Sequence, residues 1–237
     1  MTVRADLHIH SCLSPCGELT MSPQTIVSTA VRQGLGLIAL TDHNTTRNVP
    51  AFAAACARAH LAALYGCEVT SVEEVHVLAL FADPKTAIDF GEEIYASLPH
   101  DRRDPERYGD QVVVDEDETI VETLDSYLIA ATPFPLDEIG RRIHAAGGLY
   151  VPAHVDRSAF SVWSQLGFLP ADDYDAVEIT GAVGRIETGA YPRICSSDAH
   201  QPDAIGRRWI EFDGPAPGFE ALVTAMRERR IVTSIHE

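Results

Sequence analysis

The sequence is short of positive charge and contains no long hydrophobic run. Its 237 residues carry 18 Lys and Arg against 35 Asp and Glu, a formal net charge of −17. Extended polyanions bind dense Lys and Arg faces, so this balance argues against duplex nucleic acid as a partner. Cations bound among the acids would still admit a small phosphorylated substrate. No stretch approaches the ~18 consecutive apolar residues of a membrane span, which argues against a membrane partner.

Cysteine and lysine are scarce as well. The five cysteines form an odd number without regular spacing, so free thiols are expected rather than a disulfide framework. Residues 1–6 lack the apolar segment of a secretory signal. Together these features predict a cytoplasmic protein, whose oligomeric state the sequence does not reveal. Lys85 is the one lysine of the chain.

Short apolar runs alternate with helical patterns along most of the chain. Runs such as residues 3–9, 37–41 and 149–154 are typical of buried strands, and helices are expected at 22–33, 50–64, 136–146 and 219–229. Residues 85–132 interrupt this alternation with a helix and a small acidic hairpin, which indicates an inserted segment. The length suits one domain, so we expect a single α/β domain over residues 1–237.

Histidines and acids stand at the ends of these apolar runs. Imidazole and carboxylate together suit Zn²⁺, Mn²⁺ or Fe²⁺, so the sequence predicts two to three divalent metal ions and a hydrolase. Active sites of barrels with parallel strands gather at the C-terminal strand ends. The candidate ligands are His8, His10, His43, Glu68, His76, His154, Asp198 and His200.

The individual signals differ in strength. His8 and His10 point to the same side of a strand, because side chains alternate with a period of two. Asp42 has two interpretations, as the turn residue that ends its strand or as an acceptor that orients a ligand imidazole. A lone histidine inside a strand, such as His76, is more often a hydrogen-bonded core residue. Glu68 would be fully satisfied as a bridge between two ions.

In their order, these residues resemble the PHP (polymerase and histidinol phosphatase) family. The matching segments are 6–11, 40–45, 66–69, His76, His154 and 197–200. The resemblance implies a distorted (β/α)7 TIM-like barrel with a three-metal site at the C-terminal strand ends, and phosphoester hydrolysis. It also implies that His8, His10, Glu68 and Asp198 hold one ion, that Glu68, His76 and His154 hold a second, and that His43 and His200 hold a third.

One position departs from the family pattern. Family members often supply the third ion with a His or Asp shortly after the paired histidines, whereas this chain has Cys16 and Glu18 there. A Cys16 thiolate, a Glu18 carboxylate, or neither group completes the third ion's shell.

The expected reaction is metal-dependent hydrolysis of a phosphate ester, from a small phosphomonoester or a nucleotide-type substrate, by a hydroxide that bridges two ions. The expected catalytic groups are Glu68, His154, Asp198 and Arg157. Arg157 is the first choice for binding phosphate, and Arg185 and Arg193 are second choices that also suit surface ion pairs.

Two other functions remain open. An amidohydrolase-like enzyme would pair the two histidines with a bridging carboxylated lysine, and the single Lys85 lies in the inserted segment. A metal-stabilised accessory domain without catalysis is the other alternative.

Overall fold

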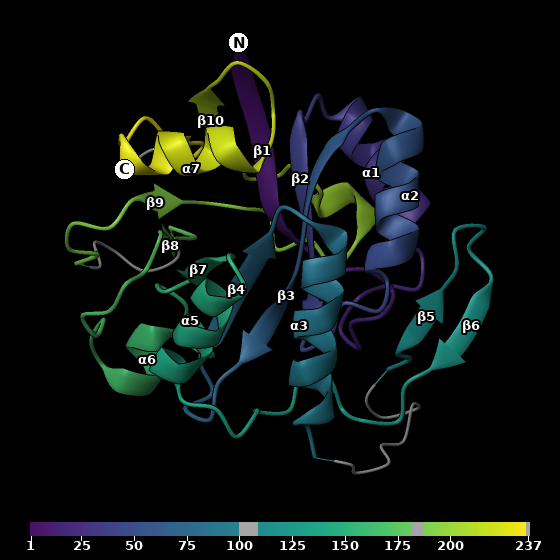
Figure 1. Cartoon of the computed structure of the whole chain (residues 1–237), viewed down its shortest axis with the longest axis horizontal. Helices are drawn as coiled ribbons and strands as arrows, with labels where there is room; N and C mark the ends of the chain where they lie inside the picture. Colours follow the sequence, from purple (N-terminus) through teal and green to yellow (C-terminus); the bar gives the residue numbers. More distant parts are fainter. Residues whose placement is uncertain (100–108, 182–186, 236–237) are drawn as a thin grey trace.

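The computed structural model describes residues 1–99, 109–181 and 187–235. Its centre is a curled seven-stranded sheet with the order β11-β10-β1-β2-β3-β4-β7 (Figure 1). The strands are β1 (Thr2–Ile9), β2 (Leu37–His43), β3 (Ala62–Thr70), β4 (His76–Phe81), β7 (Leu149–Pro152), β10 (Ile210–Asp213) and β11 (Val232–Thr233).

The strands of this sheet are not all parallel. β1, β2 and β3 pair in parallel, but β4 is antiparallel to both β3 and β7, and β10 is antiparallel to β1. Residues 71–75 join β3 to β4, and so short a link makes a hairpin, because parallel neighbours need a crossover of a dozen or more residues. The predicted α/β class is confirmed. The predicted distorted (β/α)7 barrel is not, because β4, β10 and β11 run antiparallel to their neighbours.

A second, two-stranded sheet continues the curl beside the first. β8 (Val177–Glu178) pairs in parallel with β9 (Arg193–Ile194). The Val155 amide donates to the Glu178 carbonyl at 2.8 Å, and the His10 amide donates to the Ala199 carbonyl at 3.0 Å. These bonds bring residues 177–179 alongside the end of β7 and residues 198–200 alongside the end of β1.

Helices cover the outer face of the sheet. They are α1 (Pro23–Arg32), α2 (Val49–Ala59), α3 (Pro84–Ala96), α5 (Leu136–Ala145), α6 (Val162–Leu166), the 3-10 turn η1 (Pro202–Ala204) and α7 (Phe219–Arg227). α1 begins at the Ser22 cap, whose side chain accepts from the Thr25 amide, with proline in its first turn. α2 ends earlier than expected, because His60 adopts the left-handed conformation and β3 already begins at Ala62. Among the described residues, no helix is long and apolar enough to cross a membrane.

The interrupting segment packs close to the chain that follows β1. It contributes α3 and the hairpin of β5 (Val112–Val114) and β6 (Ile120–Thr123), seen at the right of Figure 1. Leu13 lies in one buried cluster with Val113 and Leu98. The Asn48 side chain donates to Ser11 Oγ and accepts from the Val114 amide, each at 2.9 Å. The segment thus supports the loop after β1; its residues 100–108 are outside the described range.

Candidate metal centre

The candidate ligands converge at one edge of the curled sheet. The C-terminal parts of strands β1, β2 and β3 carry His8, His43 and Glu68. Because these three strands are parallel, their C-terminal ends lie together. His76 opens β4, and because β4 is antiparallel its beginning lies at the edge where β3 ends. His154 follows β7, and Asp198 and His200 follow β9. All eight predicted ligands are brought together here: His8, His10, His43, Glu68, His76, His154, Asp198 and His200.

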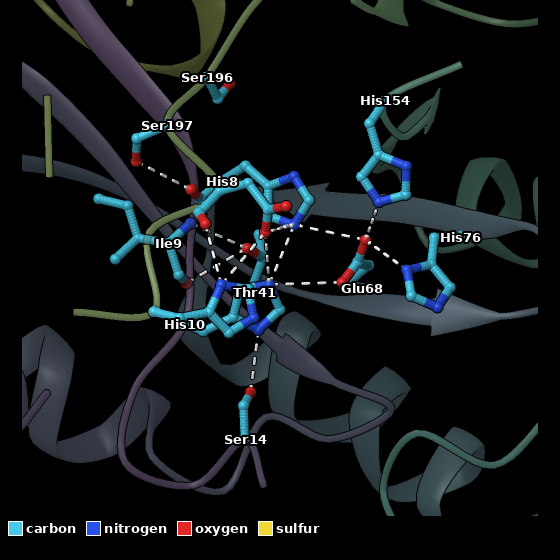
Figure 2. A network of polar contacts seen from close by, with 12 residues as sticks. His8, Ile9, His10, Ser14, Thr41, Glu68, His76, His154, Ser196 and Ser197 are labelled. Carbon is cyan, nitrogen blue, oxygen red and sulfur yellow. Dashed lines mark hydrogen bonds and ion pairs between the residues drawn. The ribbon is translucent and has the colours of Figure 1, made fainter. Parts of the chain in front are cut away.

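Glu68 lies at the centre of this cluster. Its Oε1 is 2.9 Å from His76 Nδ1, 3.0 Å from His154 Nε2 and 3.4 Å from His8 Nε2. Its Oε2 is 3.0 Å from His43 Nδ1 and 3.3 Å from His10 Nε2. In Figure 2, His76 and His154 point at the carboxylate from one side, while His8 and His10 gather on the other. One buried carboxylate thus faces five imidazoles, the arrangement expected of a bridging ligand.

Ligand atoms fall into three overlapping groups whose members lie within 4.8 Å of one another. One contains His8, His10 and Asp198, a second contains His43, Glu68 and His76, and a third contains His10, His43 and His200. The structure thus places His43 beside Glu68 as well as beside His200. The assignment of each residue to an ion, and the number of ions, remain predictions.

The chemistry of these donors fits divalent cations. The side chains are nearly all buried, with Glu68 at 1% exposed and His8 at 0%. His43 Nδ1 lies 3.0 Å from Glu68 Oε2 yet has no hydrogen-bond partner among the described residues. A buried polar atom without a partner is costly, and a cation between these two atoms would satisfy both.

Protons balance the buried carboxylates in the absence of metal. Burial opposes the ionisation of Glu68, but His76, His8 and His43 hold its pKa well below its usual value. Burial would also lower the pKa of His10, yet Asp198 and Glu68 raise it to about 9. Burial instead lowers the pKa of His43 to about 3, so this imidazole is neutral and already in the form that binds metal. Since ligands bind metal in their deprotonated form, cations would take the place of the protons on His8 and His10.

Glu178 is a site residue that the sequence analysis missed. Its carboxylate oxygens lie 3.0 and 3.2 Å from His8 Nδ1, and Oε2 also accepts from the His154 amide at 2.9 Å. A carboxylate on Nδ1 leaves His8 Nε2 free for a metal, the usual second partner of a metal-binding histidine. The available signal was an acid inside the short apolar strand at 176–179, the same signal that identified Glu68.

Asp42 orients the His10 imidazole through the hydroxyl group of Ser14. Ser14 Oγ donates to Asp42 Oδ1 at 2.7 Å and lies 2.9 Å from His10 Nδ1. With its proton committed to Asp42, the Ser14 hydroxyl accepts from His10 Nδ1, which leaves His10 Nε2 facing the cluster. Of the two interpretations of Asp42, the structure favours the acceptor that orients a ligand.

Two ligands carry unusual backbone conformations. His154 has φ of 32° and Asp198 has φ of 52°, in the left-handed region that non-glycine residues rarely adopt. Such conformations cost of order 1–3 kcal/mol each and persist where surrounding bonds hold them. The backbone just before Glu68 is constrained as well. Gly66 lies two residues before Glu68, and a Cβ at this position would overlap the carbonyl oxygen of Ala79 on β4.

Arg157 lies beside the cluster, as predicted for a phosphate-binding residue. Its Nη2 is 2.5 Å from Asp198 Oδ2, and its side chain stays 37% exposed. Arg193 belongs to β9, and its Nε donates to Thr188 Oγ1 at 2.8 Å. Arg185 lies outside the described residues.

Neither Cys16 nor Glu18 joins the three ligand groups. The Cys16 side chain is exposed, and Glu18 accepts from Thr20 Oγ1 at 3.0 Å. We therefore expect Cys16→Ser and Glu18→Gln to keep the full metal content, while His200→Ala loses about one ion per chain. Elemental analysis after reconstitution with Zn²⁺, Mn²⁺ or Fe²⁺ measures this, and loss of an ion in either of the first two variants would restore that residue as a ligand.

Comparisons with known proteins agree with this geometry. The family model of the PHP domain matches residues 6–160, and a PHP-associated model matches residues 187–231. The 5'-3' exoribonuclease Rnm of Salmonella typhimurium is 39% identical over 83 residues, 33% of this chain and 27% of that protein.

Solved structures share the fold. Endonuclease Q of Pyrococcus furiosus superposes with a TM-score of 0.71 at 19% identity, over 96% of this chain and 56% of that one. A proposed metal-dependent phosphoesterase of Bifidobacterium adolescentis superposes with a TM-score of 0.62 at 22% identity, over 95% and 96% of the two chains. This chain spans little more than half of endonuclease Q, and these identities support the fold alone.

The expectation that an acidic chain excludes duplex nucleic acid was wrong. Endonuclease Q, with the same fold, has been solved in complex with a 27-mer duplex that carries an abasic lesion at the active site, and the matching Salmonella protein is an exoribonuclease. Net charge describes the whole surface, whereas phosphate is bound at a local site where cations and arginine gather. The predicted class of metal-dependent hydrolase is confirmed at the level of the family. Because the PHP domain model spans well over half of the sequence, the chain belongs to the PHP domain family.

Proposed function

We propose that this chain hydrolyses phosphodiester bonds in nucleic acid, with divalent cations held by the cluster around Glu68. The observation that carries the proposal is the contact of one buried carboxylate with five histidines, next to Asp198 and Arg157. The partial match to an exoribonuclease supports nucleic acid as the substrate class.

The residues around the cluster have separate tasks. Bound divalent ions supply Lewis acidity toward phosphoryl oxygens and lower the pKa of water. Glu68 would help to hold the cations through its charge, and Asp198 adds charge on the side of His8 and His10. Asp198 holds Arg157 through one amino group. Within the described part of the chain, the other N–H groups of Arg157 would bind a phosphoryl oxygen as charge develops there.

The position of the single lysine argues against the amidohydrolase alternative. Lys85 lies in the first turn of α3, its side chain is 79% exposed, and its Nζ pairs with Asp89. Since it is the only lysine of the chain, no lysine is available to bridge two ions as a carbamate.

A substrate panel with one ligand variant tests the proposal. We expect metal-loaded protein to cleave end-labelled oligoribonucleotides or oligodeoxyribonucleotides. His154→Ala should abolish this cleavage, because it removes one of the candidate metal ligands that contact Glu68. His144→Ala is the matched control, since His144 is surface-accessible and pairs with Asp175. Circular dichroism should be unchanged in both variants.

The panel also includes simple phosphomonoesters such as p-nitrophenyl phosphate. Hydrolysis of monoesters alone would overturn the nucleic-acid assignment. If wild-type protein loaded with Zn²⁺, Mn²⁺ or Fe²⁺ hydrolyses none of these compounds, the accessory-domain alternative replaces catalysis.

A further inference from the structure

In the part of the chain that the structure describes, exposed aromatic side chains are confined to one short segment that begins beside the cluster. Among the described residues, the exposed aromatic side chains are Phe160 at 40%, Trp163 at 42% and Phe168 at 58%. They lie within nine residues of one another, just after His154. Isolated apolar groups on a surface need no explanation, but an exposed ring at the margin of a polar site does.

Phe160 contacts the cluster directly. Its ring is stacked on the His76 ring, with centroids 4.8 Å apart and planes 17° from parallel. Its carbonyl oxygen accepts from the His76 amide at 3.0 Å. Because one face of the ring covers His76, the exposed surface of Phe160 is its other face and edge.

The loop that carries Phe160 is held in place at several points. The Arg157 amide donates to the His154 carbonyl at 2.9 Å, and Ser161 Oγ donates to the Arg157 carbonyl at 2.7 Å. Asp156 Oδ1 accepts from the Thr180 amide at 2.8 Å. Phe160 itself has φ of 54°, a costly conformation for a bulky residue. Burial repays only part of this cost, because the ring stays 40% exposed, which favours a role outside the core.

The same loop presents a cation and an aromatic ring to different parts of the cluster. Arg157 contacts Asp198, while Phe160 contacts His76, and both residues retain exposed surface. A nucleotide has the matching chemistry, since its phosphate suits a guanidinium and its base has a flat aromatic face.

We propose that the ring of Phe160 is the stacking surface for the unpaired nucleobase next to the scissile phosphate. The inference rests on the proposed function and adds to it the feature by which the substrate is held. Stacking on an aromatic ring tolerates every base, so the surface would position a nucleotide without selecting its sequence.

Binding to an uncleavable ligand tests this separately from catalysis. The probe is an oligonucleotide with one charged, non-hydrolysable methylenephosphonate linkage and 2-aminopurine beside that linkage, and metal-loaded protein is titrated with it. The reference ligand has an abasic unit at the same place. We expect stacking to quench 2-aminopurine fluorescence, and Phe160→Ala to weaken binding of the base-containing ligand about 5- to 150-fold relative to the abasic one.

Further variants separate stacking from packing. Phe160→Leu keeps apolar bulk but should lose the quenching, whereas Phe160→Trp should retain it. Trp163→Ala, which removes the exposed ring three residues further along, should weaken base-dependent binding less than Phe160→Ala does. Val121→Ala on the β5–β6 hairpin is the control for loss of exposed apolar surface. The metal content of each variant is measured, so that a disturbed His76 is recognised.

The outcomes are distinct. Equal binding of the two ligands by wild-type protein, or equal base preference in wild type, Phe160→Leu and Phe160→Ala, would overturn the stacking surface even if the enzyme cleaves nucleic acid. Base-dependent binding without cleavage would support the surface and contradict the proposed function. If a mononucleotide competes as strongly as the oligonucleotide, the stacking surface binds free nucleotides rather than nucleotides within a strand.

Discussion

Glu68→Gln should remove most of the bound metal and nearly all phosphodiester cleavage while the fold is retained. The substitution keeps the size of the side chain but removes the charge that faces five imidazoles. Breaking a buried charge pair costs roughly 3–5 kcal/mol, which corresponds to metal binding weaker by about two to four orders of magnitude. Competition with a chelator of known affinity measures the loss.

The control for this variant is Glu211→Gln, the same chemical change on a surface residue that pairs with Arg4 at 3.6 Å. It should bind metal as wild type does, because an exposed ion pair contributes little. A Glu68→Gln protein with full metal content and full activity would remove Glu68 from the centre of the site.

Glu178→Ala should weaken metal binding about 10- to 100-fold, the usual effect of losing a carboxylate that orients a ligand histidine. The variant frees His8 Nδ1 to change its tautomer and leaves the buried His154 amide without its acceptor. Affinity is measured by chelator competition well below the unfolding temperature, because the lost hydrogen bonds also reduce stability.

Partial rescue distinguishes orientation from simple destabilisation. Glu178→Gln retains a carbonyl oxygen that accepts from His8 Nδ1, so its metal affinity should lie between those of wild type and Glu178→Ala. If both variants bind metal equally well and as tightly as wild type, Glu178 has only a structural role.

The candidate ligands could be predicted from sequence because strand ends are recognisable from apolar runs. The pattern of His8 and His10, and the acid after the run at 62–67, locate side chains on one edge without any knowledge of the strand order. Long-range pairing is a different matter, since the contact between Glu178 and His8 joins residues 170 positions apart. Nothing in the short strand at 177–178 indicates which neighbour it faces.

Three other expectations were limited by the same lack of long-range information. The antiparallel direction of β4 depends on the turn before it, which the apolar pattern does not describe. The exposed position of the Cys16 side chain depends on how the loop after β1 folds against its neighbours. The rejection of duplex nucleic acid used net charge, a sum over the chain that contains no information about where the charges lie.

The hairpin between β3 and β4 limits which insertions and deletions this protein tolerates. Glu68 pairs with Leu78 and Thr70 pairs with His76, so Glu68 and His76 are diagonal neighbours on one face of the sheet. A one-residue slip in this register would turn the His76 side chain to the opposite face. Surface turns usually tolerate insertions and deletions freely, but residues 71–75 are constrained to preserve this pairing. The length of an apparently ordinary turn is thus as much a part of the metal centre as the ligands themselves.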